Sequence, residues 1–326
     1  MKNNKRTLFL SLFLVSILVL SGCSTDESSS NESVFQIGIS QLAQHPALDD
    51  ARLGFEEGLE ELGVEAEISY QNAQGEIPNT VSIAQKFVKD EVDLIYTIAT
   101  SPAQSAKQAT TEIPILFSAV TYPVAAELVE TMDSPGGNIT GTSDESPMYE
   151  QLKLFQDLDS TINKVGIIFN TSEENSNIQV ERAKQIGEEL GIEIVEVGIS
   201  TTSDIPQAVD SIIKKVDGIY TITDNMVASA INVVAEKAIE NNMITVGAED
   251  AHIKGGILLT NGISYYELGK QTAEMAKQIL VDGKSPSDIP SASSENTKKT
   301  FNKATLEKLG LDMDNEVFSQ AEAIEE

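Results

Sequence analysis

The chain has 326 residues and a formal net charge of −29, with two histidines and one cysteine. So strong a negative charge argues against nucleic acid and anionic lipid headgroups as partners, because both would be repelled. Zinc sites need three or four clustered His, Cys or carboxylate ligands, and the sequence has no such spacing. We therefore expect no metal, no other cofactor and no nucleic-acid partner.

The N-terminal residues predict an export signal. Three basic residues precede an apolar stretch at residues 8–20, which is shorter than the roughly 20 apolar residues of a membrane span. Small residues then lead to Cys23, in a pattern that resembles the lipobox of bacterial lipoproteins. An ordinary signal peptide with a coincidental cysteine is the alternative. We predict a signal peptide over residues 1–22 and a lipid on Cys23 that anchors the protein to a membrane.

Residues 23–33 predict a flexible tether, because they are polar and acidic and cannot pack into a core. Since Cys23 is the only cysteine, no disulfide can stabilise the rest of the chain. A chain of this length can bury a large enough core without one.

From residue 34 onward, runs rich in branched residues alternate with helical patterns. We predict strands at residues 34–40, 66–72, 93–100, 113–120, 164–170, 192–199, 217–223 and 244–248. Helices are predicted at residues 47–62, 79–89, 175–190 and 226–241. Gly63 and Gly191 stand where helix C-caps belong. This alternation predicts parallel sheets covered by helices.

The two halves of the chain resemble each other. The sequence Ile-Tyr-Thr-Ile occurs at residues 95–98 and again at 219–222, each time after an aspartate and before a helix that contains Ser-Ala. Chance can produce one such match, but the common register within two strand-helix series favours a repeat. We predict an α/β fold with two doubly wound parallel-sheet lobes of equivalent topology.

The elements after the second half predict that the chain crosses between the lobes more than once. Residues 256–264 have the pattern of a strand, and residues 265–281 and 301–309 have the pattern of helices. A three-segment hinge is expected near Thr142, Ile253 and Lys284. Lobe 1 would comprise residues 34–142 and 254–284, and lobe 2 would comprise residues 143–253 and 285–326. A ligand cleft would lie between them.

In open parallel sheets, ligands bind beyond the carboxyl ends of the strands. The segments at those ends are residues 41–49, 100–102, 121–122, 170–176, 223–225 and 249–250. The candidate ligand-binding residues in them are Gln41, His45, Thr100, Ser101, Thr121, Tyr122, Asn170, Ser176, Asp224, Asn225 and Asp250. We predict no catalytic residue, because the sequence contains no nucleophile elbow, phosphate loop or metal motif.

The charges of these candidates suit a zwitterion. Ser101 is expected to cap a helix whose first residue is Pro102, where free amide groups attract an anion, although plain capping explains it equally well. Asp224 and Asp250 would bring negative charge from the other lobe, although either could simply cap a turn. The ligand's carboxylate would then bind near Ser101 and its ammonium group near the two aspartates.

Other candidates keep two interpretations. Gln41 and His45 follow the first strand and either contact the ligand or belong to the loop before a helix. Tyr122 either stacks on a flat group of the ligand or packs at the edge of the core.

Six segments carry a family resemblance. They are residues 37–39 (Ile-Gly-Ile), 45–49 (His-Pro-Ala-Leu-Asp), 70–75 (Tyr-Gln-Asn-Ala-Gln-Gly), 117–121 (Phe-Ser-Ala-Val-Thr), 135–141 (Pro-Gly-Gly-Asn-Ile-Thr-Gly) and 223–225 (Thr-Asp-Asn). Together they resemble the ABC-transporter substrate-binding lipoprotein family, which includes streptococcal tryptophan/tyrosine-binding proteins. The similarity spans residues 34–312.

The resemblance implies a type I periplasmic-binding fold, no enzymatic activity, and delivery of a solute to an ABC permease with its ATPase. Characterised relatives bind aromatic amino acids, so the resemblance implies tryptophan or tyrosine as the ligand. It also implies a monomer on the extracytoplasmic face of a Gram-positive cell membrane. Tyr122 departs from the family, because many relatives carry an acidic residue there, and ligand choice would differ if this side chain faces the cleft.

Two alternatives remain open. A receptor for a sugar or nucleoside could have the same fold, although the absence of tryptophan makes an aromatic sugar platform less favourable. A lipoprotein that presents its ligand to a membrane sensor would have the same sequence features as a transport receptor. A DNA-binding regulator would need a helix pair where the signal peptide is predicted.

Overall fold

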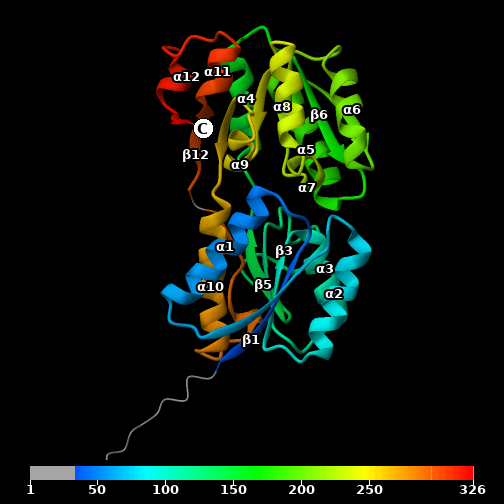
Figure 1. Cartoon of the computed structure of the whole chain (residues 1–326), viewed down its shortest axis with the longest axis vertical. Coiled ribbons are helices and arrows are strands. Elements are labelled where there is room, and N and C mark those ends of the chain that lie inside the picture. The colour runs from blue at the N-terminus through cyan, green and yellow to red at the C-terminus, as the bar shows by residue number, and fades with distance from the viewer. Residues whose placement is uncertain (1–33, 295, 326) are drawn as a thin grey trace, which may run out of the picture. The chain divides into compact units, whose positions relative to one another are not determined.

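Parallel strands form two separate sheets in the computed structural model, which describes residues 34–294 and 296–325 (Figure 1). The predicted signal peptide, the lipid on Cys23 and the tether lie outside the described residues. Among the residues that are described, no helix has both the length and the apolar character to cross a membrane.

Lobe 1 is built on the first sheet. Its strands are β1 (Phe35–Gln41), β2 (Ala66–Asn72), β3 (Leu94–Ile98), β4 (Ile115–Ser118), β5 (Ile139–Ser143) and β11 (Ala292–Ser293). They lie in the order β11-β5-β4-β3-β1-β2, and all neighbouring pairs are parallel. One face is covered by α1 (Pro46–Glu61) and α10 (Tyr265–Leu280), and the other by α2 (Ile77–Lys89) and α3 (Thr100–Ala109). A short 3₁₀ helix, η2 (Pro286–Asp288), precedes β11.

Lobe 2 is built on the second sheet. Its strands are β6 (Lys164–Asn170), β7 (Glu193–Ile199), β8 (Gly218–Thr221), β9 (Ile244–Gly247), β10 (Leu259–Gly262), β12 (Lys298–Asn302) and β13 (Glu322–Ile324). Their order is β13-β12-β10-β9-β8-β6-β7, and β10 and β12 pair antiparallel while the other pairs are parallel.

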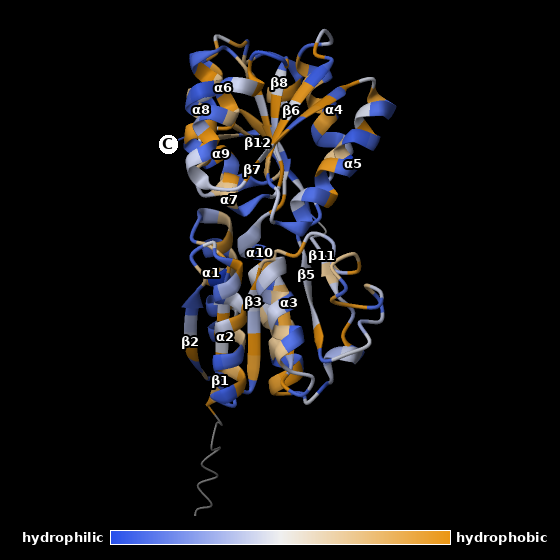
Figure 2. Cartoon of the chain, turned by 90° about the vertical axis from the view of Figure 1, so that its right-hand side faces the viewer, coloured by the Kyte–Doolittle hydropathy of each residue, from blue (hydrophilic) through white to orange (hydrophobic). Residues whose placement is uncertain are grey.

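Helices cover both faces of this second sheet as well. One face carries α4 (Met148–Leu158), α5 (Glu174–Leu190), α11 (Lys303–Lys308) and α12 (Glu316–Ser319). The other carries α6 (Ile205–Ile212), α7 (Asn225–Ala228), α8 (Ile231–Glu240) and α9 (Asp250–Lys254), with a 3₁₀ turn, η1 (Thr202–Asp204), before α6. Hydrophobic residues gather in the strands and on the inner faces of the helices, as expected for sheets buried on both sides (Figure 2).

The two lobes have equivalent topology, which confirms the predicted fold class. The order β2-β1-β3-β4-β5 in lobe 1 matches β7-β6-β8-β9-β10 in lobe 2, and both are doubly wound. The repeated Ile-Tyr-Thr-Ile falls on the equivalent strands β3 and β8. Its tyrosines, Tyr96 and Tyr220, are both fully buried. The repeat therefore marks corresponding positions in the two cores.

Most predicted boundaries agree with the structure. The strands predicted at 66–72 and 164–170 match β2 and β6 to the residue, and Gly191 ends α5 with φ at 72°. The helix predicted at 226–241 is instead two helices, α7 and α8, separated at residues 229–230. The helix predicted at 301–309 begins as strand β12, because Phe301 pairs with Leu259 and packs its ring 5.3 Å from that of Phe318. Strand β5 was not predicted.

The crossings between lobes differ from the prediction at two of three places. The first, expected near Thr142, follows β5. The second, expected near Ile253, lies between β10 and α10, because β10 is held in lobe 2 between β9 and β12. The third, expected near Lys284, lies between β11 and β12, because β11 pairs with β5 of lobe 1. Residues 254–262 therefore belong to lobe 2, and residues 285–293 belong to lobe 1.

The return of the chain to lobe 1 depends on close packing of α1 against α10. A Cβ atom on Gly54 would stand 2.0 Å from the carbonyl oxygen of Tyr266, and a Cβ on Gly269 would stand 2.1 Å from that of Ala51. Real Cβ atoms do not approach a backbone oxygen so closely. Glycine at these positions therefore allows the two helix backbones to meet.

We expect Gly269→Ala to lower the free energy of unfolding by about 1–3 kcal/mol, because the added methyl group forces α10 away from α1. Urea unfolding followed by circular dichroism measures the change. Gly137→Ala is the control, because a Cβ there would meet no atom within 4 Å, and we expect a change below about 0.5 kcal/mol. Equal urea midpoints for the two variants would contradict the importance of this helix contact.

Candidate functional site

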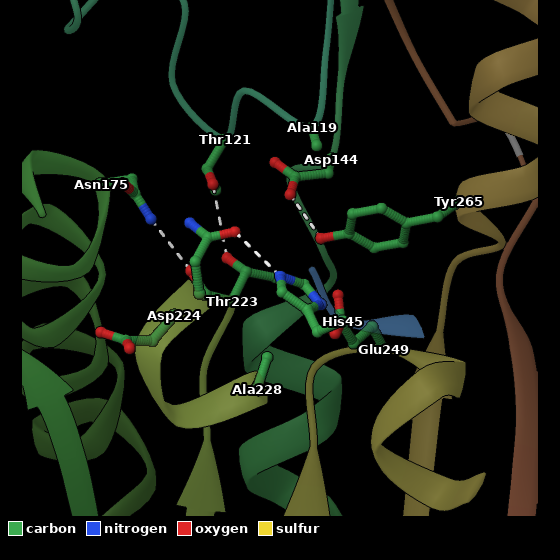
Figure 3. Close-up of a pocket in the computed structure, with 11 residues that line it drawn as sticks. His45, Ala119, Thr121, Asp144, Asn175, Thr223, Asp224, Ala228, Glu249 and Tyr265 are labelled. Atoms are coloured by element: carbon green, nitrogen blue, oxygen red, sulfur yellow. Dashed lines mark hydrogen bonds between the residues drawn. The ribbon is translucent and has the colours of Figure 1, made fainter. Parts of the chain in front are cut away.

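A small cavity of about 10 Å³ lies between the lobes, where the carboxyl ends of both sheets meet (Figure 3). The residues around it are His45, Ala119, Thr121, Asp144, Asn175, Thr223, Asp224, Asn225, Ala228, Glu249 and Tyr265. Three of these are carboxylates, and none is lysine or arginine. The cavity has room for about one water molecule, so a ligand could enter only if the lobes move apart.

The structure brings four of the predicted site residues to this cavity, namely His45, Thr121, Asp224 and Asn225. The other seven do not line it. They are Gln41, Thr100, Ser101, Tyr122, Asn170, Ser176 and Asp250.

Two of these seven shape the loops of lobe 1. The Gln41 side-chain amide donates to the carbonyl oxygen of Ala43 at 2.7 Å and to Asp49 Oδ1 at 2.8 Å, so Gln41 holds the loop that carries His45. Ser101 was predicted to cap α3, and this was wrong. The helix already begins at Thr100, after Ala99 with φ at +91°, so Ser101 lies within the first turn.

Asp250 lies outside the cavity, and its neighbour Glu249 takes the position expected for it. Asp250 is the first residue of α9 and accepts a hydrogen bond from Thr300 Oγ1 at 3.0 Å. Tyr122 does not line the cavity, and the guanidinium of Arg182 from lobe 2 stands 4.9 Å from its ring centroid.

Asp224 lines the cavity, but its oxygens are occupied by its own lobe. Oδ2 accepts from the Asn170 amide at 2.6 Å and from Ser176 Oγ at 2.7 Å, and Oδ1 accepts from the Val227 amide at 2.9 Å. The Ser176 side chain therefore supports Asp224, whereas Asn170 contributes only its backbone N–H and its side-chain amide donates to Glu173 Oε1 at 3.1 Å. Burial raises the pKa of Asp224, and these hydrogen bonds act against the rise. The carboxylate serves mainly as the N-cap of α7.

Seven cavity residues were not among the predicted ones. They are Ala119, Asp144, Asn175, Thr223, Ala228, Glu249 and Tyr265. Asn175, Thr223 and Glu249 fall inside the strand-end segments recognised in the sequence. The sequence therefore located these segments at the cavity but did not show which of their side chains face it. Asp144 and Tyr265 flank the first and second crossings between the lobes, and a correct placement of β5 and β10 would have pointed to both.

Asp144 and Tyr265 form a buried pair at one end of the cavity (Figure 3). The Tyr265 hydroxyl donates to Asp144 Oδ2 at 2.5 Å, while Asp144 Oδ1 has no partner. Burial raises the pKa of Asp144 to about 6, although the bond from Tyr265 acts to lower it. Burial also raises the pKa of Tyr265 well above its usual value, so this hydroxyl remains a donor at neutral pH.

His45 reaches the cavity from lobe 1. Its Nε2 lies 3.1 Å from Asn225 Oδ1 of lobe 2, and its Nδ1 is buried without a partner. Burial lowers the pKa of His45, which favours the neutral ring. With Nε2 donating to the Asn225 oxygen, Nδ1 is an acceptor. Both buried cavity atoms that lack a partner, Asp144 Oδ1 and His45 Nδ1, therefore accept hydrogen bonds.

Polar contacts hold the lobes together around the cavity. Besides His45 and Asn225, the pairs are Thr121 Oγ1 with Thr223 Oγ1 at 3.3 Å, Gln104 Nε2 with Glu174 Oε2 at 2.7 Å, and Lys254 Nζ with Asp50 Oδ2 at 3.3 Å. Each joins a residue of lobe 1 to a residue of lobe 2. The structure thus has the two lobes in contact.

We expect Asp224→Ala to lower the free energy of unfolding by about 1–3 kcal/mol, because three buried donors lose their acceptor. Differential scanning calorimetry measures the loss. Asp204→Ala is the control, since Asp204 caps the exposed η1 turn of the same lobe and its loss should cost about 1 kcal/mol or less. If Asp224→Ala weakens ligand binding with no loss of stability, the capping role is wrong.

Comparison with known proteins places these features in a family. Residues 36–325 match the family described as ABC transporter substrate binding protein. A tyrosine-binding protein from Clostridioides difficile (strain R20291) is 41% identical over 318 residues, which cover 93% of this chain and 92% of that protein.

Two solved structures compare as follows. The ABC domain from Streptococcus pneumonia in complex with L-Trp matches with a TM-score of 0.84 at 31% identity, over 88% of this chain and 100% of that chain. The ligand-free, open structure of a substrate-binding protein with adhesive properties from Clostridium difficile matches with a TM-score of 0.69 at 41% identity. The match covers 90% of this chain and 99% of that chain.

The backbone therefore agrees better with the L-Trp complex than with the open structure, although the sequence is closer to the latter. This agreement and the contacts across the cavity indicate a closed arrangement of the lobes. The matched residues include both lobes and every residue of the cavity. The chain belongs to the ABC transporter substrate-binding protein family, and it is a solute-binding protein and not an enzyme.

Proposed function

We propose that this protein is the receptor of an ABC importer and that its ligand is an aromatic amino acid. The observation that carries the proposal is the interlobe cavity, whose buried, unpaired side-chain atoms are acceptors and whose lining holds three carboxylates. An ammonium group is a donor without acceptors and carries a positive charge, so it suits this lining.

The aromatic side chain of the ligand is supported by the relatives. One relative at 41% identity is named as tyrosine-binding, and another structure at 31% identity holds L-Trp. The alignment with the first extends over 93% of this chain and 92% of that protein. Tyrosine and tryptophan are therefore the first ligands to test.

The family and the N-terminal sequence support a role in transport. A substrate-binding protein of an ABC transporter delivers its solute to a permease, and the lipobox-like sequence before Cys23 would hold the receptor beside that permease on the extracytoplasmic face of the membrane. The tether at residues 23–33 would give the two lobes freedom to reach the permease.

We expect L-tyrosine or L-tryptophan to raise the melting temperature of the purified protein in a thermal-shift panel of amino acids, nucleosides and sugars. A ligand at one hundred times its dissociation constant stabilises by about 2.7 kcal/mol, which such a scan detects. L-Leucine is the matched control, because it has the same ammonium and carboxylate groups without the ring. A shift with sugars or nucleosides but with no amino acid would contradict the proposal.

A further inference from the structure

We infer that a pocket at the far end of lobe 2 is a docking site for an arginine side chain of a partner protein. The pocket lies where α4 ends, β9 begins and the chain passes from α11 to α12 (Figure 1). Because β9 begins there, the pocket stands at the amino ends of the parallel strands, opposite the end that faces the interlobe cavity. This inference goes beyond the proposed function and does not depend on it.

The pocket is large enough to hold a side chain. Its volume is about 340 Å³, against about 10 Å³ for the interlobe cavity, and ligand pockets begin at roughly 300 Å³. All of its lining residues belong to lobe 2, so its shape does not depend on the distance between the lobes. One wall comes from residues 311–318, a segment that has no counterpart in the described part of lobe 1.

The floor of the pocket is apolar. Leu158, Ile244 and Leu311 are half-buried at the edge of the lobe 2 core, and the fourth apolar residue, Phe318, is buried. Half-buried aliphatic side chains leave apolar surface in contact with water, and covering that surface is favourable. The methylene groups of a long basic side chain can cover it while the charged head stays in the more polar surroundings of the rim.

Two carboxylates from different segments give the pocket a negative charge. Asp159 follows α4 and Asp312 follows α11, and both side chains are exposed. Thr161 donates to Asp159 Oδ1 from its hydroxyl at 2.7 Å and from its backbone amide at 2.8 Å, and these bonds lower the pKa of Asp159. The Asp314 amide donates to Asp312 Oδ1 at 3.0 Å. Each carboxylate is therefore oriented by its own segment.

The lining of the pocket does not neutralise this charge. Among the described residues that line it, none is lysine, arginine or histidine. The whole chain carries a formal net charge of −29, so its field attracts a cationic partner and repels an anionic one. Charge and apolar surface together select a group that combines a positive head with a long apolar stem.

Arginine fits this combination better than lysine. Its guanidinium has five N–H donors in a planar fork, so it can donate to carboxylates from two segments, and it is more weakly hydrated than an ammonium group. An arginine within a polypeptide has no free carboxylate. Free arginine has one, and it would meet two aspartates and no cation in the lining. The pocket therefore favours an arginine of a protein over the free amino acid.

Titration of the isotope-labelled protein with Nα-acetylarginine amide, followed by NMR, tests the site. This compound carries the arginine side chain and blocks both ends of the backbone. We expect saturable shifts that are largest for the amides of residues 158–160, 244 and 311–318. Nα-Acetylcitrulline amide has nearly the same shape without the charge and should bind about tenfold more weakly or worse. Equal affinities for the two compounds would overturn the inference.

Three further compounds test the other parts of the argument. Methylguanidine lacks the methylene groups that would cover the floor, so it should bind about fivefold more weakly or worse, and equal affinity would overturn the role of the floor. Nα-Acetyllysine amide should also bind more weakly than the arginine compound, and tighter binding would overturn the choice of arginine. Free L-arginine should bind no more tightly than the blocked form, and tighter binding would overturn the protein partner.

A double variant tests the two carboxylates. Asp159→Asn with Asp312→Asn should weaken binding of Nα-acetylarginine amide about tenfold or more, because both charges are lost while each side chain keeps an oxygen for Thr161 or Asp314. Asp157→Asn with Asp314→Asn is the matched control, since it removes the same charge from the same two segments and neither residue lines the pocket. Its affinity should stay within about twofold of the wild type. Equal losses in the two double variants would overturn the site.

L-Tyrosine separates this pocket from the interlobe cavity. Saturating L-tyrosine should leave the affinity for Nα-acetylarginine amide unchanged, because no residue lines both places. The circular dichroism spectrum of the double variant should match that of the wild type, which shows that lost binding does not come from unfolding. Competition between L-tyrosine and Nα-acetylarginine amide would overturn the assignment to the far end of lobe 2.

Discussion

Buried negative charge at the meeting point of two sheets is the constraint on which the rest of this molecule depends. The fold directs the carboxyl ends of the parallel strands of both sheets toward one region, and three carboxylates stand there with no lysine or arginine among the lining residues. Charges so placed need partners, and the protein meets this need unequally. Asp224 is fully bonded within lobe 2, Glu249 has His252 nearby, and Asp144 keeps one oxygen unpaired.

The duplicated topology explains why the site is divided between lobes. Each lobe repeats the same doubly wound strand order, so each brings its strand ends to the interface. The chain must then cross between lobes, and α10, which follows β10 of lobe 2 in the sequence, packs on lobe 1. Its glycine-mediated packing on α1 positions Tyr265, the first residue of α10, against Asp144. A helix contact thus determines the geometry of the cavity from outside it.

The fold class could be predicted from the sequence because hydrophobic runs and glycine caps are local signals, as in β2, β6 and Gly191. The site was only partly predictable. Whether Glu249 or Asp250 faces the cavity depends on the residue at which the chain leaves β9, and neighbouring side chains point in opposite directions. Asp144 and Tyr265 depend on where the chain crosses between lobes, which long-range strand pairing decides. Ser101 failed as a cap because Ala99 adopts a positive φ that few alanines adopt.

The position of the Asp144 and Tyr265 pair beside two crossings has a consequence for closure. Both residues belong to lobe 1, and their bond does not cross the interface, so it exists before the lobes meet. Glu249 and the Asp224 network travel with lobe 2. The Asp144–Tyr265 pair and the Asp224 network are therefore each complete within one lobe before closure, and only the contacts between the lobes remain to form when a solute is enclosed.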